Sequence, residues 1–111
     1  IICRRGVRNV LTHLGVLDGE PVVPNDADCP TLELRGTDAY VYAPTEGILE
    51  TFHDLGRQVK SGEPAGRIHH ISEPSRPPDD IFYGCDGLLF AHRQPGRVRG
   101  GNCCLVVASP V

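Results

Sequence analysis

A histidine and a glutamate with the spacing of a metal-binding pair lie in the middle of the chain. His70 and Glu73 have the H-x-x-E spacing, and His69 precedes them. A zinc-protease helix carries both of its histidines on one face, but Pro74 prevents a helix from continuing here. In a strand, His69 and His70 would point to opposite faces. We therefore predict that His70 and Glu73 lie where a strand enters a loop and that they bind no metal.

The other histidines that could serve as bases lack suitable neighbours. His53 is followed by Asp54, and His92 is followed by Arg93. Adjacent residues of a strand face apart, so neither pair is expected to form a catalytic dyad. We expect both histidines to lie in solvated turns. The sequence contains no Ser-His-Asp arrangement and no phosphate-binding loop, so we predict that this chain has no catalytic residue and is inactive in isolation.

Composition excludes several classes of function. The net charge is −3 and the pI is about 5.9, so we expect no nucleic-acid partner. No apolar stretch approaches the ~20 residues that span a bilayer, so we expect no membrane partner. The five cysteines are odd in number and include no C-x-x-C pair. This pattern favours reduced thiols in a cytoplasmic protein.

The chain opens with the pattern of a single helix. Val7, Val10 and Leu14 recur at helical spacing, and Gly15 follows as a residue suited to a helix C-terminus. We predict a helix over residues 5–17. An isolated helix of this length is marginal in water, so its apolar face must be covered.

Residues 18–30 are rich in Asp, Gly and Pro and are interpreted as a linker. The chain does not start with methionine and contains none. We therefore expect it to begin inside a longer protein. In this interpretation residues 1–17 are the terminal helix of an absent upstream catalytic domain, and residues 31–111 form a separate β domain.

An internal repeat with a period of about forty residues follows the linker. Residues 45–49 match residues 85–89, and Gly56-Arg57 matches Gly96-Arg97. Each unit ends in a mainly apolar strand, at residues 65–68 and 104–107. One such unit cannot bury its apolar face alone, so two copies are expected to pack about a pseudo-twofold axis.

The repeat resembles the biotinyl/lipoyl-like barrel-sandwich hybrid, a mainly β fold of two pseudo-symmetric repeats, here preceded by one helix. Carrier members of that fold are modified on a lysine between the two halves. The single lysine of this chain, Lys60, lies within the first repeat, and the inter-repeat residues 72–80 contain none. A carrier function is therefore disfavoured. A covalent modification found on Lys60 would support the carrier hypothesis again.

A second resemblance covers nearly the whole chain. The helical segment G-V-R-N-V-L-T-H-L-G at residues 6–15 is followed by a Pro-containing linker and then by Y-A-P-T-E-G at residues 42–47. This arrangement resembles the C-terminal part of the succinylglutamate desuccinylase/aspartoacylase family. The nearest branch is the bacterial one that includes the N-acetyl-diaminobutyrate deacetylases.

The resemblance implies a zinc-dependent amidohydrolase that deacylates N-acyl amino acids. Family members hold zinc with an H-x-x-E pair and a distant histidine in a catalytic domain upstream of this segment. The zinc is therefore expected in the upstream domain of the parent enzyme, and none is expected in this chain. The implied partners are that catalytic domain and an N-acyl amino acid substrate, and a homo-oligomer is an open expectation.

Three residues are candidates for shaping substrate access in such an enzyme. Arg76, in the inter-repeat loop, could bind a carboxylate with both guanidinium nitrogens. Tyr83 and Phe90 are aromatic, and Phe90 is the approximate counterpart of a tyrosine that reaches the substrate in the aspartoacylase branch. Phe90 lacks the hydroxyl of that tyrosine. The alternatives are solvation for Arg76 and packing within a sheet for the two rings.

A different class of function remains open from the sequence. The β domain could be a stand-alone barrel-sandwich module that binds or adapts other proteins without catalysis. A reading frame that starts near Ile1 would favour this alternative, whereas upstream H-x-x-E and His residues would favour the hydrolase.

Overall fold

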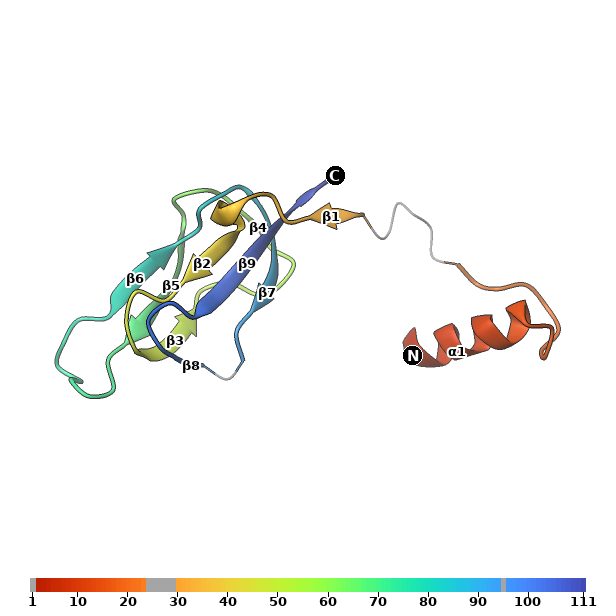
Figure 1. Ribbon diagram of the computed structural model, residues 1–111, viewed down its shortest axis with the longest axis horizontal. Coiled ribbons are helices and arrows are strands. Elements are labelled where there is room, and N and C mark those ends of the chain that lie inside the picture. Colours follow the sequence, from red (N-terminus) through yellow and green to blue (C-terminus); the bar gives the residue numbers. More distant parts are fainter. Residues whose placement is uncertain (1, 24–29, 95) are drawn as a thin grey trace. The chain divides into compact units, whose positions relative to one another are not determined.

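The computed structural model describes residues 2–23, 30–94 and 96–111 of the chain. The chain divides into two compact units, Ile1–Pro30 and Thr31–Val111 (Figure 1). The first unit contains helix α1 and the second contains all of the strands. None of the helices in the described ranges has the length and apolar character that crossing a membrane requires.

Helix α1 (Ile2–His13) begins and ends earlier than the predicted range of residues 5–17. Its end is a Schellman motif, in which two backbone N–H groups bond to carbonyls of the last turn. Val16 donates to Leu11 at 2.9 Å, and Gly15 donates to Thr12 at 3.0 Å. Gly15 has a φ of 72°, so its prediction as the terminating residue is confirmed.

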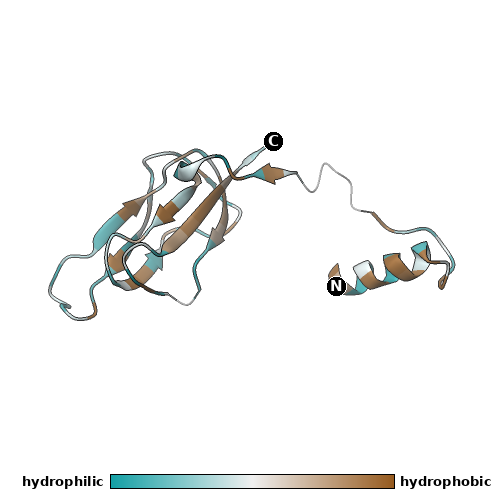
Figure 2. Ribbon diagram, viewed as in Figure 1, coloured by the Kyte–Doolittle hydropathy of each residue, from teal (hydrophilic) through white to brown (hydrophobic). Residues whose placement is uncertain are grey.

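One face of α1 is apolar and no described residue of the helix is buried. Figure 2 shows apolar and polar segments alternating along it. The backbone after the helix is tied to Asn9, whose amide donates to the Val22 carbonyl at 2.7 Å and accepts from its N–H at 2.9 Å. The predicted linker therefore starts with a segment attached to the helix, and its residues 24–29 lie outside the described part.

The second unit consists of short strands joined by tight turns and one short 3-10 helix, η2 (Thr37–Ala39). The strands are β1 (Leu32–Glu33), β2 (Tyr40–Tyr42), β3 (Gly47–Thr51), β4 (Gln58–Val59), β5 (Pro64–His69), β6 (Asp79–Phe82), β7 (Gly87–His92), β8 (Arg97–Val98) and β9 (Cys103–Pro110). One sheet has the order β1-β9-β7-β4, with β2 also paired to β9, and the other has the order β6-β5-β3-β8. All pairings are antiparallel, and the chain is mainly β.

The strand register confirms the internal repeat. β3 pairs with β5 and β8, and β7 pairs with β9 and β4 in the corresponding way. Each sheet therefore contains strands from both repeats. The structure corrects one detail of the sequence alignment. The Leu49 N–H bonds to the Gly96 carbonyl, whereas the Leu89 N–H bonds to the Arg57 carbonyl, so Gly96 corresponds to Arg57 and not to Gly56.

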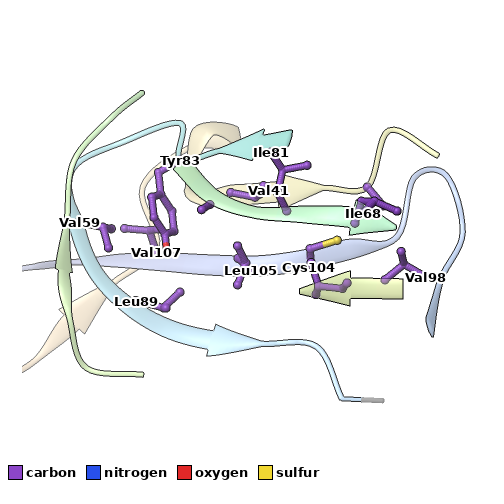
Figure 3. Packing of buried hydrophobic residues seen from close by; sticks show 13 residues of the cluster. Val41, Val59, Ile68, Ile81, Tyr83, Leu89, Val98, Cys104, Leu105 and Val107 are labelled. Atoms are coloured by element: carbon purple, nitrogen blue, oxygen red, sulfur yellow. The ribbon is translucent and has the colours of Figure 1, made fainter. Parts of the chain in front are cut away.

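Both sheets contribute to one hydrophobic core (Figure 3). The largest fully buried side chains come from strands of both repeats and from the loop after β6; they are Tyr83, Ile68, Leu89, Leu105, Val98, Val107 and Cys104. Burial of such side chains contributes roughly 1.5–3 kcal/mol each for the aliphatic ones. This shared core is what two repeats, each unable to bury its own face, require.

Candidate functional site

A cavity of about 440 Å³ opens between the turn before β3 and the loop that joins β5 to β6. The loop belongs to the inter-repeat segment. The polar residues lining the cavity include Thr45, Glu46, His70, Glu73, Arg76 and Arg97. The cavity thus brings together both repeats and the loop between them.

An aspartate at the start of β6 connects the turn and the loop. The Thr45 hydroxyl donates to Asp79 Oδ2 at 2.9 Å. His70 Nε2 lies 3.2 Å from the same oxygen, which is within ion-pair range, but the contact does not satisfy hydrogen-bond angles. The His70 side chain is only 7% exposed, so its ring is held between the strand end and this carboxylate.

Arg76 approaches the same carboxylate from the loop. Its Nη2 atom lies 3.8 Å from Asp79 Oδ2, and the side chain is about half exposed. The hydrogen bond from Thr45 lowers the pKa of Asp79, and the neighbouring His70 and Arg76 lower it further, against a smaller opposing effect of burial. Asp79 is therefore an ionised anchor at neutral pH, and the Arg76 side chain beside it is about half exposed.

Arg97 of β8 reaches across the cavity rim to Glu46. Its Nη2 atom donates to Glu46 Oε1 at 3.0 Å, and both side chains are more than half exposed. Exposed pairs of this kind contribute about 0–1 kcal/mol because water and salt screen them. The pair borders the cavity without closing it.

The two adjacent histidines bind different partners. His69, the last residue of β5, lies 2.6 Å from Glu50 through Nε2, whereas His70 faces Asp79. Glu73 lines the cavity and accepts the Arg76 N–H at its backbone carbonyl. Within residues 2–23, 30–94 and 96–111, no three His, Cys, Asp or Glu side chains gather as metal ligands would.

The prediction that His53 lies in a solvated turn is wrong. Its side chain is 13% exposed, and its Nδ1 atom lies 3.1 Å from the Tyr83 hydroxyl. Tyr83 is 2% exposed and lies in the core. Burial, and then the nearby Glu63 carboxylate, raise the pKa of Tyr83. The tyrosine therefore packs within the β unit and directs its hydroxyl to His53.

Phe90 and His92 lie on β7, where the register with β9 shifts between Leu89 and Ala91. The shift places Phe90 at a β-bulge, and its ring is 56% exposed. His92 is partly buried and lies 3.4 Å from the Gln94 amide, so a fully solvated turn is wrong here too. Of the three access candidates, Arg76 alone lines the cavity described above.

Lys60 and the described cysteines lie apart from this cavity. Lys60 follows β4 in the turn before β5, within the first repeat. The described cysteines, Cys3, Cys85, Cys103 and Cys104, are free thiols. The sequence-based prediction for Cys29 falls outside the described residues.

Sequence reasoning missed the residues that organise the cavity. Thr45 and Asp79 are 34 positions apart and meet only because β3 and β6 flank β5. Neither belongs to a motif with known chemistry. One feature of the sequence pointed to Thr45: it lies two residues before Gly47, the first glycine of the repeat, where a turn was expected.

Comparisons with known proteins identify relatives over nearly the whole chain. No family model matches. The chain is 33% identical over 112 aligned residues to the N-alpha-acetyl-L-2,4-diaminobutyric acid deacetylase of Halomonas elongata, covering 99% of this chain and 32% of that protein. The chain thus spans about a third of the length of the relatives that it matches.

Solved structures agree with this result. A succinylglutamate desuccinylase/aspartoacylase from Rhodobacter sphaeroides matches with a TM-score of 0.80 and 35% identity, over 96% of this chain and 34% of that one. The ectoine utilization protein EutE (DoeB) from Ruegeria pomeroyi, in a product-bound structure, matches with a TM-score of 0.80 and 30% identity, over 95% and 31%. The resemblance deduced from the helical segment and the repeat is confirmed: nearly the whole chain is similar to members of the succinylglutamate desuccinylase/aspartoacylase family, including a diaminobutyric acid deacetylase.

Proposed function

We propose that this chain is the C-terminal accessory domain of a zinc-dependent amidohydrolase that deacylates N-acyl amino acids. The observation that carries the proposal is the 33% identity to a diaminobutyric acid deacetylase along 99% of this chain. The chain corresponds to 32% of that protein, which leaves most of the enzyme for a catalytic domain. In this proposal the β unit is a barrel-sandwich hybrid that helps shape substrate access in a cytoplasmic enzyme.

The described residues do not fit the zinc ion that the family implies. No three potential ligands gather among them, and the cavity that holds His70 and Glu73 also holds Arg76 and Arg97. Two guanidinium groups at one cavity oppose the binding of a divalent cation. The proposal therefore assigns zinc to the upstream domain and gives no residue of this chain a catalytic step.

Helix α1 fits the end of such a catalytic domain. Val7 and Val10 of the helix and Leu14 just after its end are each more than half exposed, and no described residue of the helix is buried. A helix of 12 residues is held in place mainly by the packing of its apolar face. We assign the face to the upstream domain, and we assign residues 31–111 to the accessory role.

Arg76 is the residue through which the accessory role is argued. Loops on a rigid β scaffold commonly line the entrances of active sites. The Asp79 carboxylate holds the Arg76 side chain at the cavity while leaving it half exposed. An arginine placed in this way binds the carboxylate that every amino-acid substrate carries.

The test uses the product of the whole gene that encodes this chain, supplied with zinc. Hydrolysis is measured with N-acetyl-L-2,4-diaminobutyrate, N-succinylglutamate and N-acetylaspartate, before and after chelation. We expect zinc-dependent deacylation of at least one substrate. Absence of any deacylation would contradict the hydrolase, and a gene product that starts near Ile1 would favour the stand-alone binding module.

A second measurement addresses the access role separately. Arg76→Gln is expected to raise KM roughly ten- to hundredfold with kcat within about twofold, because a lost charged hydrogen bond weakens binding by about 1.5–3 kcal/mol. Arg35→Gln is the matched control, since Arg35 pairs with Glu33 and does not line the cavity. Equal KM values for the two variants would exclude a substrate contact by Arg76 while leaving the hydrolase intact.

A further inference from the structure

The two repeats place different residues at one equivalent position. In the first repeat, Glu63 Oε2 accepts the backbone N–H of Lys60 at 3.1 Å. In the second, Asn102 Oδ1 accepts the backbone N–H of Arg99 at 3.0 Å. The return bonds match as well, because the Glu63 and Asn102 N–H groups donate to the carbonyls of Lys60 and Arg99. A carboxylate in one repeat thus corresponds to a neutral amide in the other.

In the first repeat the Glu63 carboxylate pairs with an arginine and lies close to a histidine. Arg57 Nη2 donates to Glu63 Oε1 at 2.9 Å, and His53 Nε2 lies 3.6 Å from the same oxygen. The Glu63 side chain is only 26% exposed. This turn therefore contains its own anion, in a partly buried place between an arginine and a histidine.

In the second repeat three arginines line one hollow, and the turn at Asn102 has no carboxylate in the position of Glu63. This hollow, of about 410 Å³, is lined by Arg93, Arg97, Arg99 and Asn102. Arg97 is paired with Glu46 at the rim. Across the described residues, no carboxylate oxygen comes within 4.0 Å of the guanidinium nitrogens of Arg93 or Arg99.

We propose that this hollow binds a free carboxylate beside the Asn102 amide, held by guanidinium groups as Arg57 holds the Glu63 carboxylate in the first repeat. Like charges that share one hollow repel each other, and an anion between them removes that cost. Guanidinium groups present paired N–H donors that match the two oxygens of a carboxylate. In the first repeat the corresponding turn holds a carboxylate against an arginine. The hollow shares Arg97 with the cavity described above but includes no residue of the Arg76 loop, and the inference does not depend on the hydrolase assignment.

Binding is tested on the full 111-residue chain by NMR titration with sodium acetate and sodium succinate at pH 7 and constant ionic strength. We expect saturable shifts of the Arg93, Arg99 and Asn102 signals, with a Kd of about 1–10 mM, because exposed ion pairs are individually weak. Arg99→Gln should weaken binding roughly three- to tenfold. Arg35→Gln, which removes an arginine outside the hollow, should leave the titration unchanged.

A second variant reproduces the first repeat in the second. Asn102→Glu supplies the missing carboxylate from within the chain, so it should abolish succinate binding and raise the thermal unfolding temperature. The isosteric variant Asn102→Asp serves the same purpose if the longer side chain prevents folding. Succinate binding that survives in both variants would overturn the proposal.

Inorganic phosphate provides the test of ligand class. The precedent of Glu63 predicts that acetate and succinate saturate the site, with phosphate no tighter than succinate. Tighter binding of phosphate would overturn the carboxylate assignment. Shifts that do not saturate, or that are identical in Arg93→Gln, Arg99→Gln and the wild-type chain, would show that the hollow is not an anion site.

Discussion

Val98 of the second repeat pairs with Gly47 of the first, at the point where β8 joins β3. The reciprocal pair is Val59 of the first repeat with Gly87 of the second, where β4 joins β7. Both valines are buried, at 0% and 2% exposure. Each repeat thus completes the sheet of the other, so neither can retain its core without its partner.

The first prediction concerns the glycine of that pair. At Gly47 a Cβ atom would overlap the His69 carbonyl oxygen and lie 2.6 Å from Ile68 Cγ2. Gly47→Ala should therefore destabilise the chain by about 1–3 kcal/mol through overpacking. Gly100→Ala is the control, because the nearest atom to its Cβ would be the Pro44 carbonyl at 3.6 Å. Urea unfolding should show a lower midpoint for Gly47→Ala alone, and equal midpoints would contradict the close approach.

The second prediction concerns the buried tyrosine. Tyr83→Phe removes the contact with His53 Nδ1 and should cost about 1 kcal/mol of unfolding free energy, measured by urea denaturation. Tyr42→Phe, at a 53% exposed position, should change stability by less than about 0.5 kcal/mol. In the hydrolase proposed above, Tyr83→Phe should leave KM unchanged. A KM effect without a stability effect would instead support a substrate contact.

The third prediction concerns pH and the aspartate at the cavity. The pKa of Asp79 is lowered in the folded chain, chiefly by the Thr45 hydroxyl. Its contribution to stability is therefore present above the unfolded pKa of about 3.9 and is lost as pH falls through the folded value. Thr45→Val should raise the pKa of Asp79 in an NMR titration and should destabilise the chain more at pH 7 than at pH 2.

Thr45→Ser is the matched control for this experiment because it retains the hydroxyl. It should keep both the lowered pKa of Asp79 and the stability at pH 7. A loss of stability in Thr45→Val that is the same at both pH values would show that packing, and not the hydrogen bond to the carboxylate, is the cause.

The fourth prediction concerns thiol reactivity. Cys104 is 1% exposed, and burial followed by the neighbouring Cys103 raises its pKa to about 11. At pH 8 about one Cys104 in a thousand is then a thiolate, the form that reacts. Iodoacetamide mapped by mass spectrometry should label the exposed Cys3 at least tenfold faster than Cys104. In urea the two cysteines should be labelled at similar rates, which provides the reference. Equal labelling rates for Cys3 and Cys104 in the native chain would contradict the buried position of Cys104.

The repeat and the family were predictable because they depend on features that are local in sequence. Glycines often mark turns, and glycines at matching positions, such as residues 47 and 87, indicated two related units. The αL position of Gly15 was predictable for the same reason. The first and last residues of α1 could not be predicted to within a few positions. The helix ends where its last backbone carbonyls accept hydrogen bonds from the following turn.

The environment of individual histidines could not be predicted from the sequence. His53 was expected in a solvated turn because its neighbour Asp54 would face away from it, yet its partner is Tyr83, 30 positions away. The alternation of residues along a strand predicts which side chains share a face of that strand. It does not predict which other segment packs against that face.

The sequence by itself determined that this is a mainly β chain with one leading helix, two glycine-punctuated repeats and a family resemblance carried by local motifs. Only the tertiary structure decided which residues meet. Strand pairing across the two repeats brings Thr45 to Asp79 and His53 to Tyr83, and it aligns Glu63 with Asn102. The reason is physical: hydrogen-bond register and a shared core join distant segments, and both are properties of the folded chain rather than of any local pattern.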